Sequence, residues 1–223
     1  MFTMFLNHFN TAILNHNSPF SLVLEYIGYF TAVTMCYFLV EGYHYTHSKK
    51  KYALRMLVFA VISQIPYLMA LEYMQFNMLF TLLLCMGVLW VLENVQIAWQ
   101  RYLGVIALII CSMFFDWGIL APIFTWMFAR SRGDREGNIR AYMIAAAMFA
   151  YLNFTSYVLT ETLGKAVLMA LCSSLGIVAS GILILGFYDG KKLQKKSAIS
   201  KWFFYIFYPA HLLVLGVIRM YNM

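Results

Sequence analysis

Long apolar runs separated by short polar breaks fill almost the whole chain. The runs lie near residues 2–14, 21–42, 52–71, 76–93, 101–115, 118–129, 140–160, 165–187 and 202–219. Most of them approach the roughly 20 residues that an α-helix needs to cross a bilayer, although the first and the sixth are short. We therefore expect an all-α, polytopic helix bundle with about nine membrane crossings, within a range of about eight to ten. These helices are expected to form a single domain over residues 1–223.

Two runs leave alternatives open. The first contains Asn7 and His8 and lacks both a basic leader and a small-residue cleavage site, so we interpret it as a retained polar helix rather than a signal peptide. The sixth follows Asp116-Trp117-Gly118 and contains Pro122. It can cross with a kink or re-enter, and a re-entrant backbone must be covered by protein.

Composition excludes a soluble globular protein, because 63% of the residues are hydrophobic and 11% are charged, against about 25% charge in soluble domains. The cysteines lie far apart in apolar runs, which favours buried thiols over disulfides or zinc ligands. They are Cys36, Cys85, Cys111 and Cys172. A net charge of +7 suggests nucleic acid in a soluble protein, but in a membrane protein the location of the charges matters more. We expect no nucleic-acid partner.

The basic residues indicate the orientation, because Lys and Arg gather on the cytoplasmic side of a membrane. With nine crossings and a cytoplasmic amino terminus, 14 of the 16 Lys and Arg lie on that side. They are Lys49, Lys50, Lys51, Arg55, Arg101, Arg130, Arg132, Arg135, Arg140, Lys191, Lys192, Lys195, Lys196 and Lys201, while Lys165 and Arg219 fall outside. A re-entrant sixth run would put the later clusters on opposite faces. The pattern favours a multi-pass membrane protein in contact with lipid, with its basic loops on the cytoplasmic side.

Ionisable and amide side chains inside membrane spans are costly, about 2.5–3.5 kcal/mol at the centre for charged groups, and so are functional candidates. Those here are His8, Glu25, Glu41, Gln64, Asn77, Thr81, Asp116 and His211. His8 and His211 lie at similar depth on the first and last runs, which often close a bundle. Imidazole titrates near 6.5, so such a pair suits proton transfer, but a lone histidine can equally be a hydrogen bond between helices.

The inner end combines aromatic, acidic and cationic groups. Glu41 and Tyr43 precede the triplet Lys49-Lys50-Lys51. Such groups can stack a base and pair with phosphates, but topology alone also requires the positive charge, which attracts anionic lipid as well. We expect no metal, because His44 and His47 fit a wet helix end better than a metal site. The chain has none of the GxSxG, Walker A, HExxH or GxGxxG motifs.

Four sequence blocks resemble the TraX family. In order they are FLVEGYHYTHSKKKYALRMLVFAVISQIPY, NMLFTLLL, FDWG and KWFFYIFYPAHLLVL, and the similarity covers about residues 30–217. The resemblance implies a multi-pass acyltransferase of the inner (cytoplasmic) membrane that transfers an acetyl group from cytoplasmic acetyl-CoA to an acceptor at the outer face. A family member acetylates the amino-terminal amine of pilin. Family positions fall on Glu41, Arg55, Gln64, Asn77, Asp116, Trp117, Tyr208 and His211.

Two positions depart from the family pattern. The first helix usually carries Asp-His, and this chain has Asn7-His8. A carboxylate that orients the imidazole is thus replaced by an amide, unless Asp116 or Glu41 takes its place. Gln64 also stands where an acid is common. The chain can therefore be a divergent enzyme with another acceptor, or one that has lost activity.

The resemblance and the side assignment together give a mechanism as a hypothesis. His8 acts as general base, or as an acetyl-carrying nucleophile, with Asp116, Asn77 and His211 as further catalytic residues. The CoA donor is held by Glu41, Tyr43, Lys49, Lys50, Lys51, Arg55, Arg130 and Arg132. Acceptor contacts come from Gln64, Thr81, Trp117 and Tyr208, and Asn77, Thr81 or Tyr208 donates to the oxyanion. The acceptor is a pilin-like peptide or another envelope component.

Two other functions remain open from the sequence. A transporter or channel would use the midplane His and Glu side chains as a relay, although no internal repeat is visible. A non-catalytic scaffold of an envelope or conjugation complex would fit the missing aspartate. Saturable stabilisation by CoA favours the enzyme over both.

Overall fold

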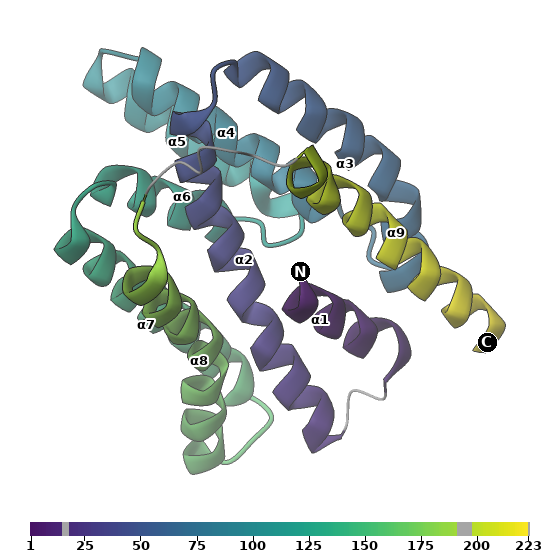
Figure 1. The fold of residues 1–223 in the computed structure, drawn as a ribbon. Coiled ribbons are helices and arrows are strands. Elements are labelled where there is room, and N and C mark those ends of the chain that lie inside the picture. The colour runs from purple at the N-terminus through teal and green to yellow at the C-terminus, as the bar shows by residue number, and fades with distance from the viewer. Residues whose placement is uncertain (15–17, 191–197, 223) are drawn as a thin grey trace.

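In the computed structural model, which describes residues 1–14, 18–190 and 198–222, the chain is an all-helical bundle (Figure 1). Its helices are α1 (Phe2–Ile13), α2 (Pro19–Tyr45), α3 (Lys49–Leu71), α4 (Met78–Asn94), α5 (Ala98–Cys111), the 3-10 helix η1 (Ser112–Phe114), α6 (Leu120–Ser131), α7 (Arg135–Tyr157), α8 (Leu163–Phe187) and α9 (Ala198–Asn222). Each apolar run of the sequence corresponds to one of the α-helices. The all-α prediction is confirmed.

Several helices are long and apolar enough to cross a membrane. They are Pro19–Tyr45, Lys49–Leu71, Leu163–Phe187 and Trp202–Tyr221, and Met78–Asn94 and Ala98–Phe114 are shorter apolar helices. The 12 residues of α1 span about 18 Å at 1.5 Å per residue, less than the roughly 30 Å of a hydrocarbon core. The chain is thus a helical bundle of the multi-pass membrane type, and nine crossings stays a prediction.

Polar residues in the breaks between apolar runs start the long helices. The Ser18 side chain accepts a hydrogen bond from the Ser21 backbone N–H at 3.1 Å, next to a proline in the first turn. The Asn77 side chain likewise accepts from the Leu79 N–H at 3.0 Å. Each cap satisfies a backbone donor that the first turn leaves without a partner. The breaks therefore define the helix boundaries chemically as well as by lost hydrophobicity.

Helix α2 runs through the middle of the molecule and packs against α1, α4, α6 and α8 (Figure 1). Helices α7 and α8 form a hairpin on one side, and α3 packs against α9 and α4 on the other. The approach of α8 to α2 is close, because a Cβ on Gly176 would lie 2.4 Å from the Tyr26 carbonyl oxygen. Small residues permit this packing where lipid supplies no hydrophobic driving force.

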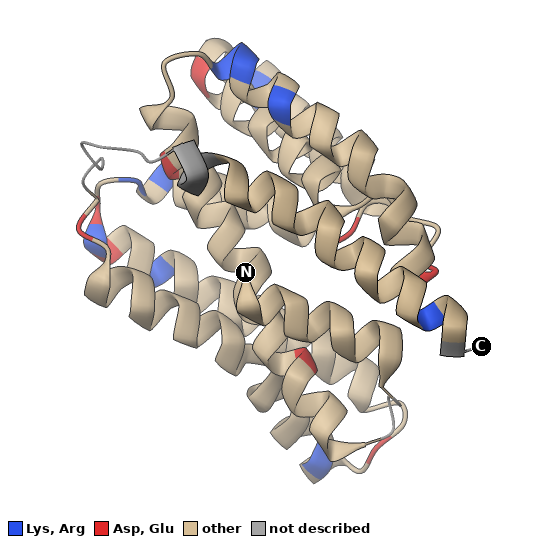
Figure 2. Cartoon of the chain, turned by 45° about the vertical axis from the view of Figure 1, so that its right-hand side comes forward, with Lys and Arg blue, Asp and Glu red and all other residues tan. Residues whose placement is uncertain are grey.

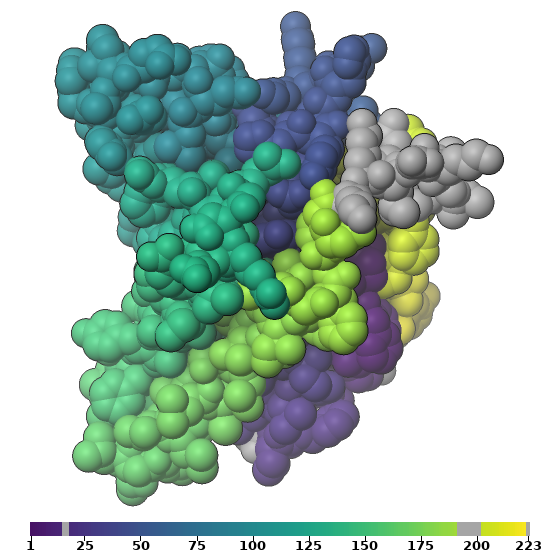
Figure 3. Space-filling view, turned by 60° about the vertical axis from the view of Figure 1, so that its left-hand side comes forward, coloured from purple at the N-terminus to yellow at the C-terminus, as the bar shows by residue number. Residues whose placement is uncertain are grey.

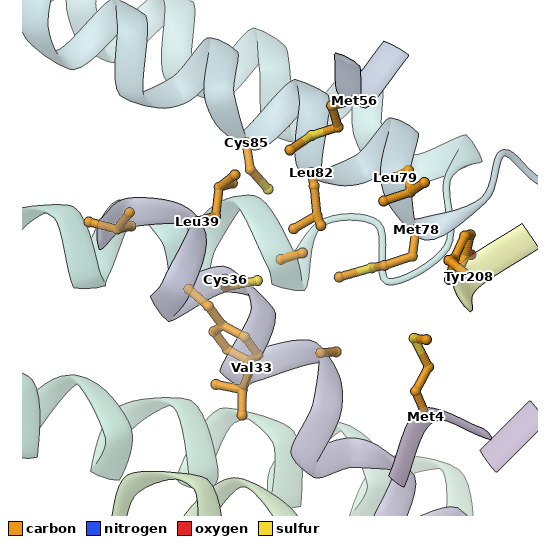
Figure 4. Packing of buried hydrophobic residues seen from close by; sticks show 14 of the residues in the cluster. Met4, Val33, Cys36, Leu39, Met56, Met78, Leu79, Leu82, Cys85 and Tyr208 are labelled. Atoms are coloured by element: carbon orange, nitrogen blue, oxygen red, sulfur yellow. The ribbon is translucent and has the colours of Figure 1, made fainter. Parts of the chain in front are cut away.

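The core between α2 and α4 contains two of the cysteines. Cys36 and Cys85 are fully buried and face each other among leucine and methionine side chains (Figure 4). The expectation of a buried thiol is confirmed for these two but is wrong for Cys111, which is exposed. The reason is that α5 packs mainly against α4 and leaves its other side uncovered.

Ion pairs show which helix ends lie together. At one end, the Arg132 Nε is 2.8 Å from a Glu41 carboxylate oxygen, and Lys49 pairs with Glu93. We call this the basic end, and Figure 2 shows most Lys and Arg there, at the upper left. At the opposite end, Arg219 pairs with Glu72 at 2.8 Å.

Helix α6 connects these two ends. It follows the segment in which Phe115 lies beside Phe76, and it finishes at the Arg132 that pairs with Glu41. Helix α6 thus runs from the Glu72–Arg219 end of the bundle to the basic end. Whether the sixth run crosses or re-enters a bilayer stays a prediction.

The two cations predicted outside are each neutralised at the opposite end. Lys165 pairs with Glu161 at 2.8 Å, and Arg219 pairs with Glu72. The net positive charge of the described residues thus lies at the basic end. That this end faces the cytoplasm stays a prediction. The side chains of Lys191, Lys192, Lys195, Lys196 and Lys201 lie outside the described part of the chain.

Candidate active site between helices α1, α2 and α9

The two histidines predicted at similar depth are in direct contact. Helix α1 packs against α9, and His8 Nδ1 lies 2.8 Å from His211 Nε2. The imidazole planes are inclined by only 4°, and the ring centroids are 5.1 Å apart. Both side chains are buried, at 7% and 6% exposure. A second hydrogen bond joins His211 Nδ1 to the Phe207 carbonyl oxygen at 2.7 Å.

A cavity of about 80 Å³ lies beside His8. Its lining includes His8, Asp116, Trp117 and Tyr208, four of the residues that the sequence proposed for the site. Figure 4 shows Met4, Met78 and Tyr208 around this region, and all three belong to the lining. The volume equals that of two or three water molecules at about 30 Å³ each, so a small acyl group and an attacking atom fill it.

The turn that carries Asp116 is fixed by contacts from the α3–α4 connection and from α4. The Asp116 N–H donates to the Phe76 carbonyl at 2.8 Å, and the Thr81 hydroxyl donates to the Asp116 carbonyl. Trp117 and Ile119 have φ of +57° and +65°, a region that residues other than glycine rarely adopt. Strain of this kind persists only where the surroundings impose it, and it often marks functional sites.

The Asp116 carboxyl lies in the connection between η1 and α6, at the wall of the cavity. Burial raises the pKa of this carboxyl to about 7, because a low-dielectric surrounding disfavours the charged form. At neutral pH the group therefore exists in both protonation states. It can attract a cation or give up a proton within the ordinary working range of an enzyme.

Three predicted site residues have structural roles instead. The Asn77 amide donates to the Ala60 carbonyl at 2.8 Å and to the Gln64 side-chain oxygen at 2.9 Å. The Thr81 hydroxyl is used on the Asp116 carbonyl. None of Asn77, Thr81 and Gln64 lines the cavity beside His8. The hypothesis that Asn77 or Thr81 donates to an oxyanion is corrected here, because their donors hold the backbone.

Tyr208 lies at the cavity beside His8. It is fully buried and lines the cavity, with its ring centroid 6.1 Å from that of His8. The Met78 backbone is its polar neighbour, and its hydroxyl has no well-formed hydrogen bond within the described residues. A buried donor without a good partner costs free energy unless a ligand supplies one. Tyr208 is therefore the remaining candidate to donate to an oxyanion.

Described residues of the basic end line two cavities. One, of about 630 Å³, is lined by Tyr43, Lys49, Lys50 and Trp90. Glu41 does not belong to it, because positions two apart on a helix point in nearly opposite directions. Glu41 thus faces another cavity than Tyr43 and the lysines, and a common donor site that includes all of them stays a prediction.

Glu41 belongs to the second cavity, of about 370 Å³, with Arg132, Arg135 and Tyr188. Figure 3 shows the recessed end of α2, in dark blue, between the atoms around the α6–α7 connection and those at the end of α8. The Glu41 carboxylate accepts from Arg132 at 2.8 Å and from Tyr188 at 3.3 Å. The acidic side chain therefore holds an arginine in place and is not free for a ligand.

The other predicted donor residues lie around these cavities. Arg55 stacks over the Tyr52 ring at 5.9 Å, and Arg130 over the Trp126 ring at 5.8 Å. Lys51 is exposed in the same helical turn as Lys50. Packed side chains separate the basic end from the His8 cavity: Leu39, Met56 and Leu82 lie on their helices between the residues that line the two cavities, and each is at most 3% exposed. A donor that reaches His8 from the basic end must displace such side chains.

Sequence reasoning missed part of the lining. Tyr67 and Tyr73 border the His8 cavity, and Tyr29 and Phe149 border a second cavity of about 350 Å³ that shares Asp116 and Trp117 with it. Tyr29 donates to Glu25 one turn earlier on α2, so an i, i+4 Glu–Tyr pair in a span was the available signal. No group of three or more His, Cys, Asp or Glu side chains suited to a metal occurs within the described residues.

Comparison with known proteins agrees with the sequence blocks. The family model described as TraX protein matches residues 1–219. The chain belongs to the TraX family. This TraX-family chain is also 30% identical over 234 residues to the probable fimbrial assembly protein FimC, serogroup H1, of Dichelobacter nodosus, and the alignment covers 98% of this chain and 91% of the relative. No solved structure is significantly similar to it.

Proposed function

We propose that this TraX-family chain is an integral inner-membrane acetyltransferase that uses acetyl-CoA as donor and an amine or hydroxyl of an envelope component as acceptor. The observation that carries the proposal is the buried His8–His211 pair at a small cavity shared with Asp116 and Tyr208. A general base, a hydrogen-bond donor and a carboxyl of near-neutral pKa at one cavity match the needs of acyl transfer. A thioester is activated enough to need no metal.

The reaction balances without an additional reagent. An acceptor ammonium first releases one proton to water. The neutral amine nitrogen, or a hydroxyl oxygen, then forms a bond to the acetyl carbon while the carbon–sulfur bond to CoA breaks. His8 takes the proton of the acceptor, and this proton then neutralises the CoA thiolate. Tyr208 donates to the carbonyl oxygen as negative charge develops on it.

The basic end supports a donor with phosphates and an aromatic base. Tyr43 and Trp90 line the larger cavity beside Lys49 and Lys50, so an adenine can stack while ammonium groups pair with phosphates. The packed side chains between this cavity and His8 imply that the pantetheine arm enters only when the helices separate. The acceptor then approaches from the opposite end, where Asp116 lies.

The printed name of the Dichelobacter nodosus relative points to a fimbrial acceptor. We propose a pilin-like peptide as the first acceptor to test. An envelope sugar or lipid would need an outer mouth of the same kind, and fold analogy does not choose between them. A transporter would instead move a solute without CoA, and a scaffold would bind neither donor nor solute.

Saturable stabilisation by CoA tests the donor site. We expect CoA to raise the unfolding temperature of the purified chain, because a ligand that binds only the folded state stabilises it. Lys50→Glu should raise the half-saturating CoA concentration by about tenfold, equivalent to about 1.4 kcal/mol of binding free energy. Thermal unfolding in detergent over a range of CoA concentrations measures both.

Matched variants decide between the two basic cavities. Arg135→Glu makes the same charge reversal at the smaller cavity, and Lys165→Glu makes it at the opposite end. A larger effect of Arg135→Glu would move the donor site to the Glu41 cavity. No stabilisation by CoA at any concentration would argue against the enzyme and favour the transporter or the scaffold.

The role proposed for Asp116 predicts a pH effect. If this carboxylate attracts an acceptor ammonium, Asp116→Asn should lower kcat/KM for an amine acceptor above pH 7 and have little effect below about pH 6. The sign follows from the raised pKa of about 7, since the protonated carboxyl of the wild type resembles the amide. The wild-type to variant ratio of kcat/KM at each pH is measured, which cancels the ionisation of the acceptor.

Asp134→Asn serves as the control for this pH effect, because Asp134 caps α7 at the basic end and asparagine caps equally well. Its ratio to wild type should stay flat. A flat ratio for Asp116→Asn as well would remove Asp116 from ammonium binding.

A further inference from the structure

The hydrogen bonds of His211 determine which of its nitrogens carries the proton. Its Nδ1 lies 2.7 Å from the Phe207 carbonyl oxygen, and a carbonyl only accepts. Nδ1 of His211 must therefore hold a hydrogen. In the neutral imidazole, Nε2 is then an acceptor.

The proton position on His211 in turn determines the proton position on His8. His211 Nε2 is the atom that contacts His8 Nδ1, at 2.8 Å. With an acceptor on one side, His8 Nδ1 must donate, which leaves a lone pair on His8 Nε2. His8 lines the cavity while His211 does not, so the Nε2 edge is the part of the ring that remains for a ligand.

Asn7, which stands where the TraX family usually has an aspartate, does not orient the His8 imidazole. A Cβ on Gly28 would lie 2.4 Å from the Asn7 Cγ, so the Asn7 side chain packs against the backbone of α2. The Asn7 amide occupies the space between α1 and α2 that a side chain at position 28 would fill. The partner of His8 Nδ1 comes instead from α9.

We propose that His211 is a positioning residue that holds His8 in the tautomer with its proton on Nδ1, so that Nε2 is the atom that accepts the proton of the acceptor. His211 thus takes the orienting role that a carboxylate has in a serine-protease triad, with a neutral imidazole in its place. The proton moves from the acceptor to His8 Nε2 while the Nδ1–H···Nε2 bond to His211 stays in place. This inference rests on the proposed acetyl transfer for its catalytic meaning, but the tautomer is testable without activity.

Two substitutions separate orientation from structure. His211→Phe keeps an aromatic ring between α1 and α9 and removes the acceptor. His211→Gln keeps a side-chain carbonyl that can accept from His8 Nδ1. We expect His211→Phe to lower kcat by about 10- to 100-fold with little change in KM, and His211→Gln to recover part of the loss.

The tautomer of His8 is the decisive measurement, because a His211 that served only for packing would not determine which His8 nitrogen carries the proton. In the full chain with ¹⁵N-labelled histidine, in detergent, His8 should show a protonated Nδ1 and a bare Nε2, assigned by the signals lost in His8→Ala. In His211→Phe this preference should disappear, while His211→Gln should retain it. His47→Phe, an exposed site at the basic end, should leave the His8 signals and kcat unchanged.

The outcomes separate failure of the inference from failure of the proposed function. A proton on His8 Nε2 in the wild type would overturn the inference, as would an unchanged His8 tautomer in a folded His211→Phe. If the tautomers are as expected but no acetyl transfer is detected, the proposed function is rejected and the role of His211 in fixing the His8 tautomer is retained. If His211→Phe does not fold, the His211→Gln variant and the wild-type spectrum still decide.

Discussion

Replacing His8 with alanine is expected to lower kcat for acetyl transfer by about 10²- to 10⁴-fold, the usual contribution of a positioned general base. The reason is that His8 is the side chain of the buried pair that lines the cavity, and no second imidazole borders it within the described residues. KM for acetyl-CoA should change little, because the proposed donor contacts lie at the basic end. Steady-state transfer to a pilin-derived peptide in detergent measures both constants.

Two controls make this result interpretable. His47→Ala removes an exposed imidazole at the basic end and should keep the activity of the wild type. CoA should still stabilise His8→Ala, which shows that the fold and the donor site survive. Equal kcat in His8→Ala and wild type would exclude His8 as the essential base.

Replacing Gly118 with alanine is expected to destabilise the bundle by about 2–4 kcal/mol, near the upper range for a single core substitution. A Cβ at this position would lie 2.0 Å from the Ser112 carbonyl oxygen and 2.9 Å from that of Phe115. Both atoms belong to the backbone, so no flexible side chain can move away. The turn between η1 and α6 must shift, and Asp116 shifts with it.

Thermal unfolding and kcat/KM measured together test this prediction. Gly164→Ala is the matched control, since a Cβ there meets nothing within 4 Å and alanine favours a helix over glycine. It should be neutral or slightly stabilising. If Gly118→Ala unfolds at the temperature of Gly164→Ala, the proposed crowding of this turn is wrong.

The fold was predictable to the extent that a bilayer constrains it. A span needs a long apolar run and polar caps, so the helix positions follow from local sequence. The positions of Lys and Arg indicate which helix ends lie together at the basic end of the bundle. Lys165 and Arg219 are the two basic residues predicted outside this group, and each is paired with an acidic side chain. The depth of α1 in the bilayer was not predictable, because a helix of 12 residues is too short to cross and can lie at any level.

The site was predictable only in part. His8 and Asp116 stood out because polar groups in apolar runs are costly, whereas Tyr208 was indicated only by the family resemblance. Asn77 stood out for the same reason, but it caps α4 and ties α4 to α3 through the Ala60 carbonyl. Cost identifies a polar residue that needs a partner. It does not distinguish a backbone partner from a substrate.

The sequence by itself determined the all-helical architecture, the boundaries of the helices and the basic end, because these depend on residues near one another in the chain. Only the tertiary structure decided which polar groups meet. His8 and His211 are separated by 203 positions and come together only through the packing of α1 against α9. Glu41 and Tyr43 are two positions apart and lie in different cavities, because a helix turns by about 100° per residue.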